Sequence, residues 1–268
     1  MGHHVKPRQG SGQTLYDLPE YYDIAFSWDI TREIENLQRC FQKHGASPVR
    51  RLLEPACGTG RFLVAFALRG YKLVGYDNNP GMIEYAWRRV AEQGLEDSVE
   101  VFVGDMRTAG VGRAFDAAFN PINSLGYLLS DGDVLAHLRN TGNALRKGGV
   151  YIVQLNCASE MLGSHRGAWV SERGGTRIRT SWRTVGEDHE RKLSHQLCRM
   201  KISDHGRELM IQEKHTMRLW LFEDIRELVQ RSGVFRLGGI YDEKGRTIPK
   251  STRITGELGN LHYVLVSI

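Results

Sequence analysis

The sequence predicts an α/β fold: a doubly wound, seven-stranded, mostly parallel sheet whose last strand is antiparallel, with an antiparallel β insertion. Two observations lead to this prediction. Between residues 48 and 156, short apolar runs alternate with segments of helical periodicity, the pattern of parallel strands joined by right-handed helical crossovers. After Asn156 the apolar period changes to two and polar turns separate the runs, as in an antiparallel meander.

The N-terminal third supplies the first elements. Residues 16–27 are rich in aromatic side chains, and a helix follows with Ile30, Ile34, Leu37 and Phe41 on one stripe. Gly45 ends this helix. The next elements alternate in type: strands at 49–53, 71–76 and 99–103, with helices at 61–68 and from Pro80, a residue favoured at the first helical position.

The remaining elements follow in the same way. A fourth strand at 115–120 precedes a helix at 131–146 and a fifth strand at 150–156. Three strand-like segments cover 178–184, 193–202 and 209–219, and their spacing is that of a meander. A helix at 221–231 and strands at 234–241 and 262–268 complete the sheet.

Composition excludes several classes of protein. The 268 residues are 41% hydrophobic and 25% charged, as in ordinary globular proteins. No apolar run approaches the roughly 20 residues that span a bilayer, and residues 1–12 lack the apolar core of a secretory signal, so we expect a cytoplasmic protein. The net charge of +5 is dispersed, which disfavours nucleic acid as a partner. The four cysteines and ten histidines show no metal-ligand spacing, and no metal is expected.

Three strand ends carry the most informative residues. The run Leu52-Leu53-Glu54-Pro55-Ala56-Cys57-Gly58-Thr59-Gly60-Arg61 leads from a strand through a turn of small residues into a helix, and such a turn lets a ligand touch the backbone. Asp77 ends the second strand roughly 20 residues later, the spacing of a ribose-binding carboxylate. Gly104-Asp105-Met106 follows the third strand. Together these ends predict a site for an adenine nucleoside.

At this point the chain resembles the class I, Rossmann-like S-adenosylmethionine-dependent methyltransferases, closest in motif to small-molecule N-methyltransferases. The resemblance implies that S-adenosylmethionine is the cofactor, that Asp77 holds the ribose hydroxyls, and that Asp105 and the Met106 backbone N–H bind adenine. Ala56 replaces the first glycine of the family motif. The implied cofactor-binding residues are Tyr22, Glu54, Ala56, Cys57, Gly58, Gly60, Asp77, Asn78, Met82, Gly104, Asp105, Met106 and Asn120.

Two other interpretations of the turn are weaker. An NAD-binding turn would have a third glycine three residues after Gly60, and its pyrophosphate would be repelled by Glu54. A carboxylate instead suits the sulfonium and ammonium groups of S-adenosylmethionine. The glycines can also have the purely structural role of permitting tight strand-to-helix turns. The occurrence of all three motifs in sequence order, each at a predicted strand end, favours a nucleoside site instead.

The segment after the fourth strand is where acceptors meet the cofactor in this fold. Asn120-Pro121-Ile122-Asn123 is similar to the (Asp/Asn)-Pro-Pro-aromatic motif of nucleic acid base methyltransferases, but Ile122 and Asn123 replace the second proline and the aromatic residue. The run Asn123-Ser124-Leu125-Gly126-Tyr127-Leu128 resembles a segment of small-molecule N-methyltransferases, including those of amino sugars. The resemblance makes Tyr127 and Asn123 the candidate catalytic residues; a packed ring at the start of a helix is the alternative for Tyr127.

The resemblance also implies three regions: residues 1–47 as an N-terminal segment with a lid helix, 48–157 with 220–268 as the cofactor domain, and 158–219 as an insertion over the acceptor site. Tyr21 and Tyr22 either cover the sulfonium or pack in a core. Trp169 and Trp182 either line an acceptor pocket or anchor the meander. The histidines of the insertion are potential general bases, or else surface and packing residues: His165, His189, His195 and His215.

The predicted function is therefore methyl transfer to a small-molecule acceptor, with an amine favoured. The alternatives are a tRNA or nucleic acid base methyltransferase and a non-catalytic regulatory protein that binds a nucleoside. We expect no membrane partner, and a monomer or a homodimer formed through the insertion. The sequence leaves the acceptor, and the choice between nitrogen and oxygen, open.

Overall fold

The structure, a computed structural model, describes residues 8–9, 14–46, 48–112, 115–156, 166–252, 254 and 258–268. Cys157, His165 and the start of the predicted insertion lie outside these residues. The chain forms two compact units, one from Met1–Trp28 with Ser164–Met217 and a larger one from Asp29–Gly163 with Arg218–Ile268. Within the described part of the chain, no helix has the length and apolar character needed to cross a membrane.

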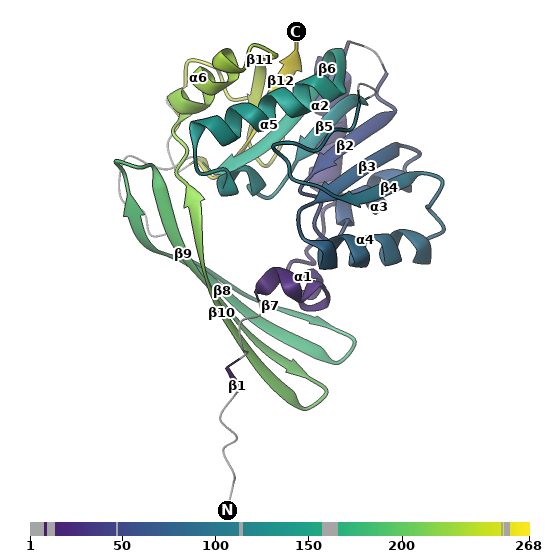
Figure 1. Cartoon of the computed structure of the whole chain (residues 1–268), viewed down its shortest axis with the longest axis vertical. Helices are drawn as coiled ribbons and strands as arrows, with labels where there is room; N and C mark the ends of the chain where they lie inside the picture. Colours follow the sequence, from purple (N-terminus) through teal and green to yellow (C-terminus); the bar gives the residue numbers. More distant parts are fainter. Residues whose placement is uncertain are drawn as a thin grey trace, which may run out of the picture. The chain divides into compact units, whose positions relative to one another are not determined.

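The larger unit is built on a seven-stranded sheet with the order β11-β12-β6-β5-β2-β3-β4 (Figure 1). The neighbours among β2 to β6 pair in parallel, whereas β12 pairs antiparallel with both β6 and β11. The predicted mostly parallel sheet with an antiparallel last strand is thus confirmed. Its strands are β2 (Arg51–Pro55), β3 (Lys72–Asp77), β4 (Val99–Val103), β5 (Phe115–Asn120), β6 (Leu145–Asn156), β11 (Phe235–Tyr241) and β12 (Asn260–Ser267).

Helices cover both faces of this sheet. The helices α2 (Thr31–His44), α3 (Arg61–Ala67) and α4 (Pro80–Glu92) pack into one core, and α5 (Asp131–Ala144) and α6 (Phe222–Ser232) pack into the other. Side chains alternate between the faces, so that Leu52 lies in the first core and Leu53 in the second. The fold is therefore a three-layer α/β/α sandwich.

Local sequence signals set the helix starts near the edge at which the parallel strands end. Pro80 opens α4, and the side chain of Asn79 accepts a hydrogen bond from the Met82 N–H at 3.0 Å. Ser130 caps α5 by accepting from the Asp133 N–H at 3.1 Å. The short 3-10 helix η2 (Ser124–Tyr127) lies between β5 and α5 and begins after Asn123.

The smaller unit contains an antiparallel sheet of four long strands, β7 (Arg166–Arg173), β8 (Thr176–Asp188), β9 (Leu193–Asp204) and β10 (Arg207–Arg218), with the short β1 (Arg8–Gln9) parallel to β10. This confirms the predicted antiparallel insertion. The helices η1 (Leu15–Asp17) and α1 (Pro19–Ala25) cover the sheet, and Ile24 and Phe26 share a core with Ile178 and Met200.

The two units divide the N-terminal region differently from the predicted regions. The prediction placed residues 1–47 together, but α1 belongs to the smaller unit and α2 to the larger one. The reason is the partner of each apolar stripe: Ile34 and Phe41 of α2 pack with the residues of the parallel sheet, whereas Ile24 of α1 packs on the antiparallel sheet.

Candidate functional site

The turn after β2 has an unusual backbone. Ala56, Gly58 and Gly60 all have left-handed dihedrals, with φ of 54°, 53° and 73°. A β-carbon on Gly60 would lie 3.1 Å from the Ala86 Cβ, a tight contact, and the φ of 73° disfavours any residue other than glycine there. An L-residue pays roughly 1–2 kcal/mol for this conformation, which makes Ala56 a strained position in the turn. The turn therefore presents backbone to any ligand above it.

Asp77 links this turn to the next strand. Its Oδ2 accepts the Gly58 N–H at 3.0 Å, and its Oδ1 accepts the Asn79 N–H at 3.0 Å. Burial raises the pKa of Asp77, and the hydrogen bonds from backbone N–H groups oppose that shift. The carboxylate thus fixes the ends of two strands with respect to each other.

Glu54 is a buried carboxyl group in the larger unit. Its side chain is 2% exposed, and its Oε2 has no hydrogen-bond partner among the described residues. Burial raises its pKa well above the usual range, and the nearby Arg61 only partly opposes this. A buried carboxylate with an unpaired oxygen is costly, and a cationic ligand would stabilise it.

Asp105 is held by a residue that the sequence did not point to. Arg107 donates from its backbone N–H and its guanidinium to the Asp105 carboxylate, and from Nη1 to Asp133 at 3.0 Å. The hydrogen bonds from Arg107 lower the pKa of Asp105. The sequence signal that could have identified Arg107 is its position, two residues after the acid.

Asn120 closes the edge at the end of β5. Its side chain is wholly buried, and Nδ2 donates to the Pro55 carbonyl at 2.8 Å. Its Oδ1 has no partner among the described residues. One hydrogen-bonding group of Asn120 therefore remains available to a ligand at this edge.

The chain beyond β5 is strained and held by β6. Ile122 and Asn123 both adopt left-handed dihedrals, with φ of 64° and 55°. Gln154 accepts the Ile122 N–H, and the Asn156 N–H donates weakly to the Asn123 Oδ1 at 3.4 Å. A non-glycine residue with left-handed dihedrals costs of order 1–3 kcal/mol, and such strained residues cluster at functional loops. Gln154 was not among the predicted residues.

A buried histidine supports the segment that is predicted to bind adenine. His137 lies inside α5 with no exposed surface, its Nδ1 2.9 Å from the Met106 carbonyl and its Nε2 2.7 Å from the Tyr151 hydroxyl. Burial lowers its pKa to about 4, so the ring is neutral at pH 7. Its Nδ1 must then donate to the carbonyl, and its Nε2 must accept from Tyr151. Sequence analysis missed His137.

The structure brings most of the predicted residues to adjacent strands. Glu54, Asp77 and Asn120 lie at the ends of β2, β3 and β5, and Asp105 follows β4. Since parallel strands share the edge at which they end, these polar groups lie along one edge of the sheet. The others are distributed along this edge: Cys57 and Met82 are buried, Asn78 is exposed, Gly104 donates to the Asp77 carbonyl at 2.9 Å, and Met106 and Tyr127 are half-buried. Their roles toward a ligand remain predictions.

Several candidates lie in the smaller unit. Tyr22 packs among aromatic rings, and its ring centroid lies 4.5 Å from that of Phe26. These contacts are those of a core residue, and its role as a lid over the cofactor remains a prediction. Trp169 donates to the Ala25 carbonyl at 2.6 Å and anchors α1. His215 is buried and stacks on Trp182 at 4.7 Å. His189 and His195 are exposed.

Comparison with known proteins agrees with this geometry. Residues 52–149 match the family model described as a methyltransferase domain. An N,N-dimethyltransferase of dTDP-3-amino-3,4,6-trideoxy-α-D-glucopyranose from Streptomyces venezuelae is 31% identical over 103 residues, 38% of this chain and 41% of that protein. A dTDP-4-amino-2,3,4,6-tetradeoxy-D-glucose N,N-dimethyltransferase from Saccharopolyspora spinosa is 32% identical over 38% of this chain and 39% of its own length. The match thus spans about two fifths of these curated relatives.

Solved structures share the fold over nearly the whole chain. The sugar N-methyltransferase KedS8 from a Streptoalloteichus species superposes with a TM-score of 0.75 at 20% identity, covering 99% of this chain and 98% of its own. DesVI from Streptomyces venezuelae gives a TM-score of 0.74 at 19% identity, with 96% and 99% covered. The sheet order and the glycine-containing turn of this chain agree with the match of residues 52–149 to a methyltransferase domain.

Proposed function

We propose that the protein transfers a methyl group from S-adenosylmethionine to an amine of a small molecule. The observation that carries the proposal is the buried Glu54 carboxylate with an unpaired oxygen, at the same edge as Asp77 and Asp105. The cofactor, when bound, supplies an activated methyl on a positively charged sulfur. Glu54 would balance cationic charge, Asp77 would accept the ribose hydroxyls, and Asp105 with the Met106 N–H would bind adenine.

The loop after β5 favours an amine over a hydroxyl acceptor. The polar side chains in and beside it are those of Asn120, Asn123, Ser124 and Tyr127, with Gln154 and Asn156 on β6. These are amides, an aliphatic hydroxyl and a phenol, none of them an ordinary base at pH 7. A neutral amine needs mainly alignment, whereas a hydroxyl needs a proton acceptor as well. The relatives that methylate the amino groups of dTDP-linked sugars support an amino sugar as the acceptor.

A direct test uses the whole protein. S-adenosylmethionine at millimolar concentration should raise the melting temperature, because a micromolar binder then adds about 4 kcal/mol, whereas NAD should not. Radiolabelled methyl transfer to dTDP-amino sugars, simpler amines and tRNA then identifies the acceptor. Transfer to tRNA with a steep salt dependence would replace the proposal by a base methyltransferase. Cofactor binding without transfer to any amine would favour the regulatory alternative.

The Tyr127→Phe variant tests the acceptor side. We expect kcat to fall about tenfold while the Kd for the cofactor stays unchanged, since one hydrogen bond to the acceptor contributes about 1.4 kcal/mol. Steady-state kinetics with the identified acceptor measure the effect. Tyr71→Phe is the matched control, because Tyr71 accepts a hydrogen bond from Gln38 far from this loop. Equal kinetics for both variants would remove Tyr127 from the acceptor site.

The Glu54→Gln variant tests the charge balance. Because the pKa of Glu54 is raised, the acid binds a proton more readily in the folded than in the unfolded chain, so its contribution to stability is lost as pH rises above about 4.5. Cofactor affinity should rise with pH as Glu54 ionises, and the variant should bind more weakly with a flatter pH profile. Calorimetry between pH 5 and 8 measures the Kd for S-adenosylmethionine of both proteins. Glu100→Gln is the control, because the Glu100 side chain is exposed.

We also propose a cytoplasmic protein that acts as a monomer or homodimer. Cys40, Cys57 and Cys198 are free thiols, as expected in a reducing compartment. Light scattering of the purified chain determines its oligomeric state.

A further inference from the structure

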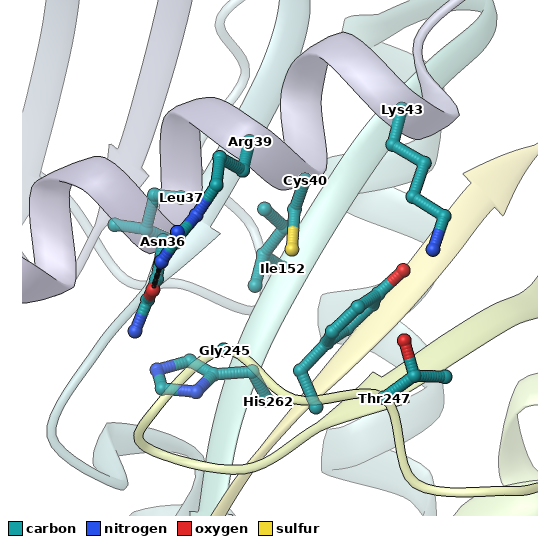
Figure 2. Close-up of a pocket in the computed structure, with 10 residues that line it drawn as sticks. Asn36, Leu37, Arg39, Cys40, Lys43, Ile152, Gly245, Thr247 and His262 are labelled. Carbon is teal, nitrogen blue, oxygen red and sulfur yellow. Dashed lines mark hydrogen bonds between the residues drawn. The ribbon is translucent and has the colours of Figure 1, made fainter.

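A cavity of about 200 Å³ lies beneath α2, away from the residues predicted to bind the cofactor (Figure 2). Helix α2 forms one wall, Ile152 of β6 and His262 of β12 form the floor, and the turn after β11 closes the side. No residue of the predicted cofactor or acceptor set lines it. The cavity is therefore a feature of the larger unit that the proposed function does not use.

The lining carries positive charge and no carboxylate. Arg39 and Lys43, one turn apart on α2, line the cavity, and neither forms an ion pair within the described residues. Lys43 Nζ lies 5.3 Å from the centre of the Tyr241 ring. The nearest acids on the following turn are engaged elsewhere: Asp242 accepts from Arg246 at 2.6 Å, and Glu243 accepts from Asn260 at 2.6 Å. The cavity thus attracts anions.

A buried polar group on the floor lacks a partner. His262 is 6% exposed, and its Nδ1 makes no hydrogen bond within the described residues. Buried polar atoms are nearly always satisfied, by water or ligand if not by protein. The Thr247 hydroxyl lines the same space (Figure 2). The Thr247 hydroxyl can donate to an oxygen of a ligand, and His262 can do so in the tautomer or charge state that places a proton on Nδ1.

The turn after β11 keeps the space open. Gly245 has a φ of 75°, and a β-carbon there would lie 2.6 Å from the Asn36 Oδ1 and 2.9 Å from the Arg39 Nη2. Apolar surface from Leu37 and Ile152 completes the wall. Two cations, two hydrogen-bonding groups and an apolar wall suit a small, partly apolar anion better than a neutral or cationic molecule.

We propose that this cavity is a binding site for a small oxyanion, a carboxylate or phosphate compound, distinct from the cofactor edge. Arg39 and Lys43 neutralise its charge, and His262 and Thr247 hydrogen-bond its oxygens. The inference does not depend on the proposed function, since it uses none of the residues assigned to methyl transfer.

The test measures binding of sodium phosphate and sodium succinate to the full chain by calorimetry and thermal shift, against sodium chloride at the same ionic strength. We expect saturable binding of at least one probe, and Lys43→Gln should weaken it roughly tenfold. Binding of phosphate alone or succinate alone assigns the class of oxyanion. The control Lys147→Gln removes an exposed lysine elsewhere and should bind as the wild type does.

Two further variants keep the test decisive. Arg39→Gln replaces Lys43→Gln if the latter does not fold, and Gly245→Ala should abolish binding by crowding Asn36 and Arg39. The proposal is overturned if neither probe binds more tightly than chloride, or if Lys43→Gln and Arg39→Gln bind the probe as the wild type does. A water-filled cavity in a crystal soaked with the probe would also overturn it.

Discussion

Replacing Asp77 by asparagine is expected to weaken S-adenosylmethionine binding about a hundredfold. The carboxylate already holds the turn after β2 through Gly58 and the start of α4 through Asn79. It is also the predicted acceptor of two ribose hydroxyls. A hydrogen bond to a charged group contributes about 1.5–3 kcal/mol, and a hundredfold change in Kd corresponds to about 2.8 kcal/mol. Asparagine offers only one acceptor oxygen, so it cannot replace all of these contacts.

Isothermal calorimetry with wild-type and variant protein checks this result. Asp97→Asn is the matched control, because this exposed side chain lies at the opposite end of β4 from Asp105. A melting temperature measured without ligand separates loss of binding from loss of folding. An Asp77→Asn protein that binds S-adenosylmethionine as tightly as the control would exclude Asp77 from the ribose site.

Replacing His137 by phenylalanine is expected to destabilise the protein by about 3 kcal/mol. Phenylalanine fills a similar space but leaves the Tyr151 hydroxyl and part of the Met106 carbonyl's hydrogen-bonding capacity buried without a partner. Each unsatisfied group costs about 1–3 kcal/mol. Because the Met106 segment is predicted to bind adenine, cofactor affinity should fall as well.

Urea denaturation of a double-mutant cycle tests the origin of this loss. Tyr151→Phe removes the hydroxyl that donates a hydrogen bond to His137. The double variant should then lose less stability than the sum of the losses of the two single variants. Additive losses would show that the two side chains act independently.

The same histidine predicts a dependence on pH. Its pKa is about 4 in the folded protein, below the ordinary value near 6.5, because burial disfavours the charged ring. The unfolded chain therefore binds more protons between these values, and stability should fall as pH drops from about 6.5 toward 4. The His137→Phe variant should lack this part of the pH dependence.

Local patterns were sufficient to predict that the candidate cofactor-binding residues lie along one edge of the sheet. The turn with Gly58 and Gly60, and the acids Asp77 and Asp105, each follow a strand within a few residues. Strand periodicity and the rule that parallel strands share an edge then bring them together. The antiparallel insertion was predictable for the same reason, because a period of two is visible over short windows.

Contacts between distant elements were not predictable in this way. His137 acts through Met106 and Tyr151, and Gln154 holds Ile122 from another strand, so their partners are fixed only by the tertiary fold. Helix α1 was missed because it is short and its aromatic residues carry no clear stripe. The start of β6 at Leu145, five residues before the predicted strand, reflects its pairing with Phe115 of β5.

The position of β12 has a consequence for how the protein is made. Residues Asn260–Ser267, at the end of the chain, insert between β6 and β11. Until they leave the ribosome, β6 keeps an unpaired edge and β11 has no neighbour. The nascent chain thus exposes an aggregation-prone strand edge from the emergence of β6 until β12 follows, and chaperones that shield strand edges should bind it during that interval.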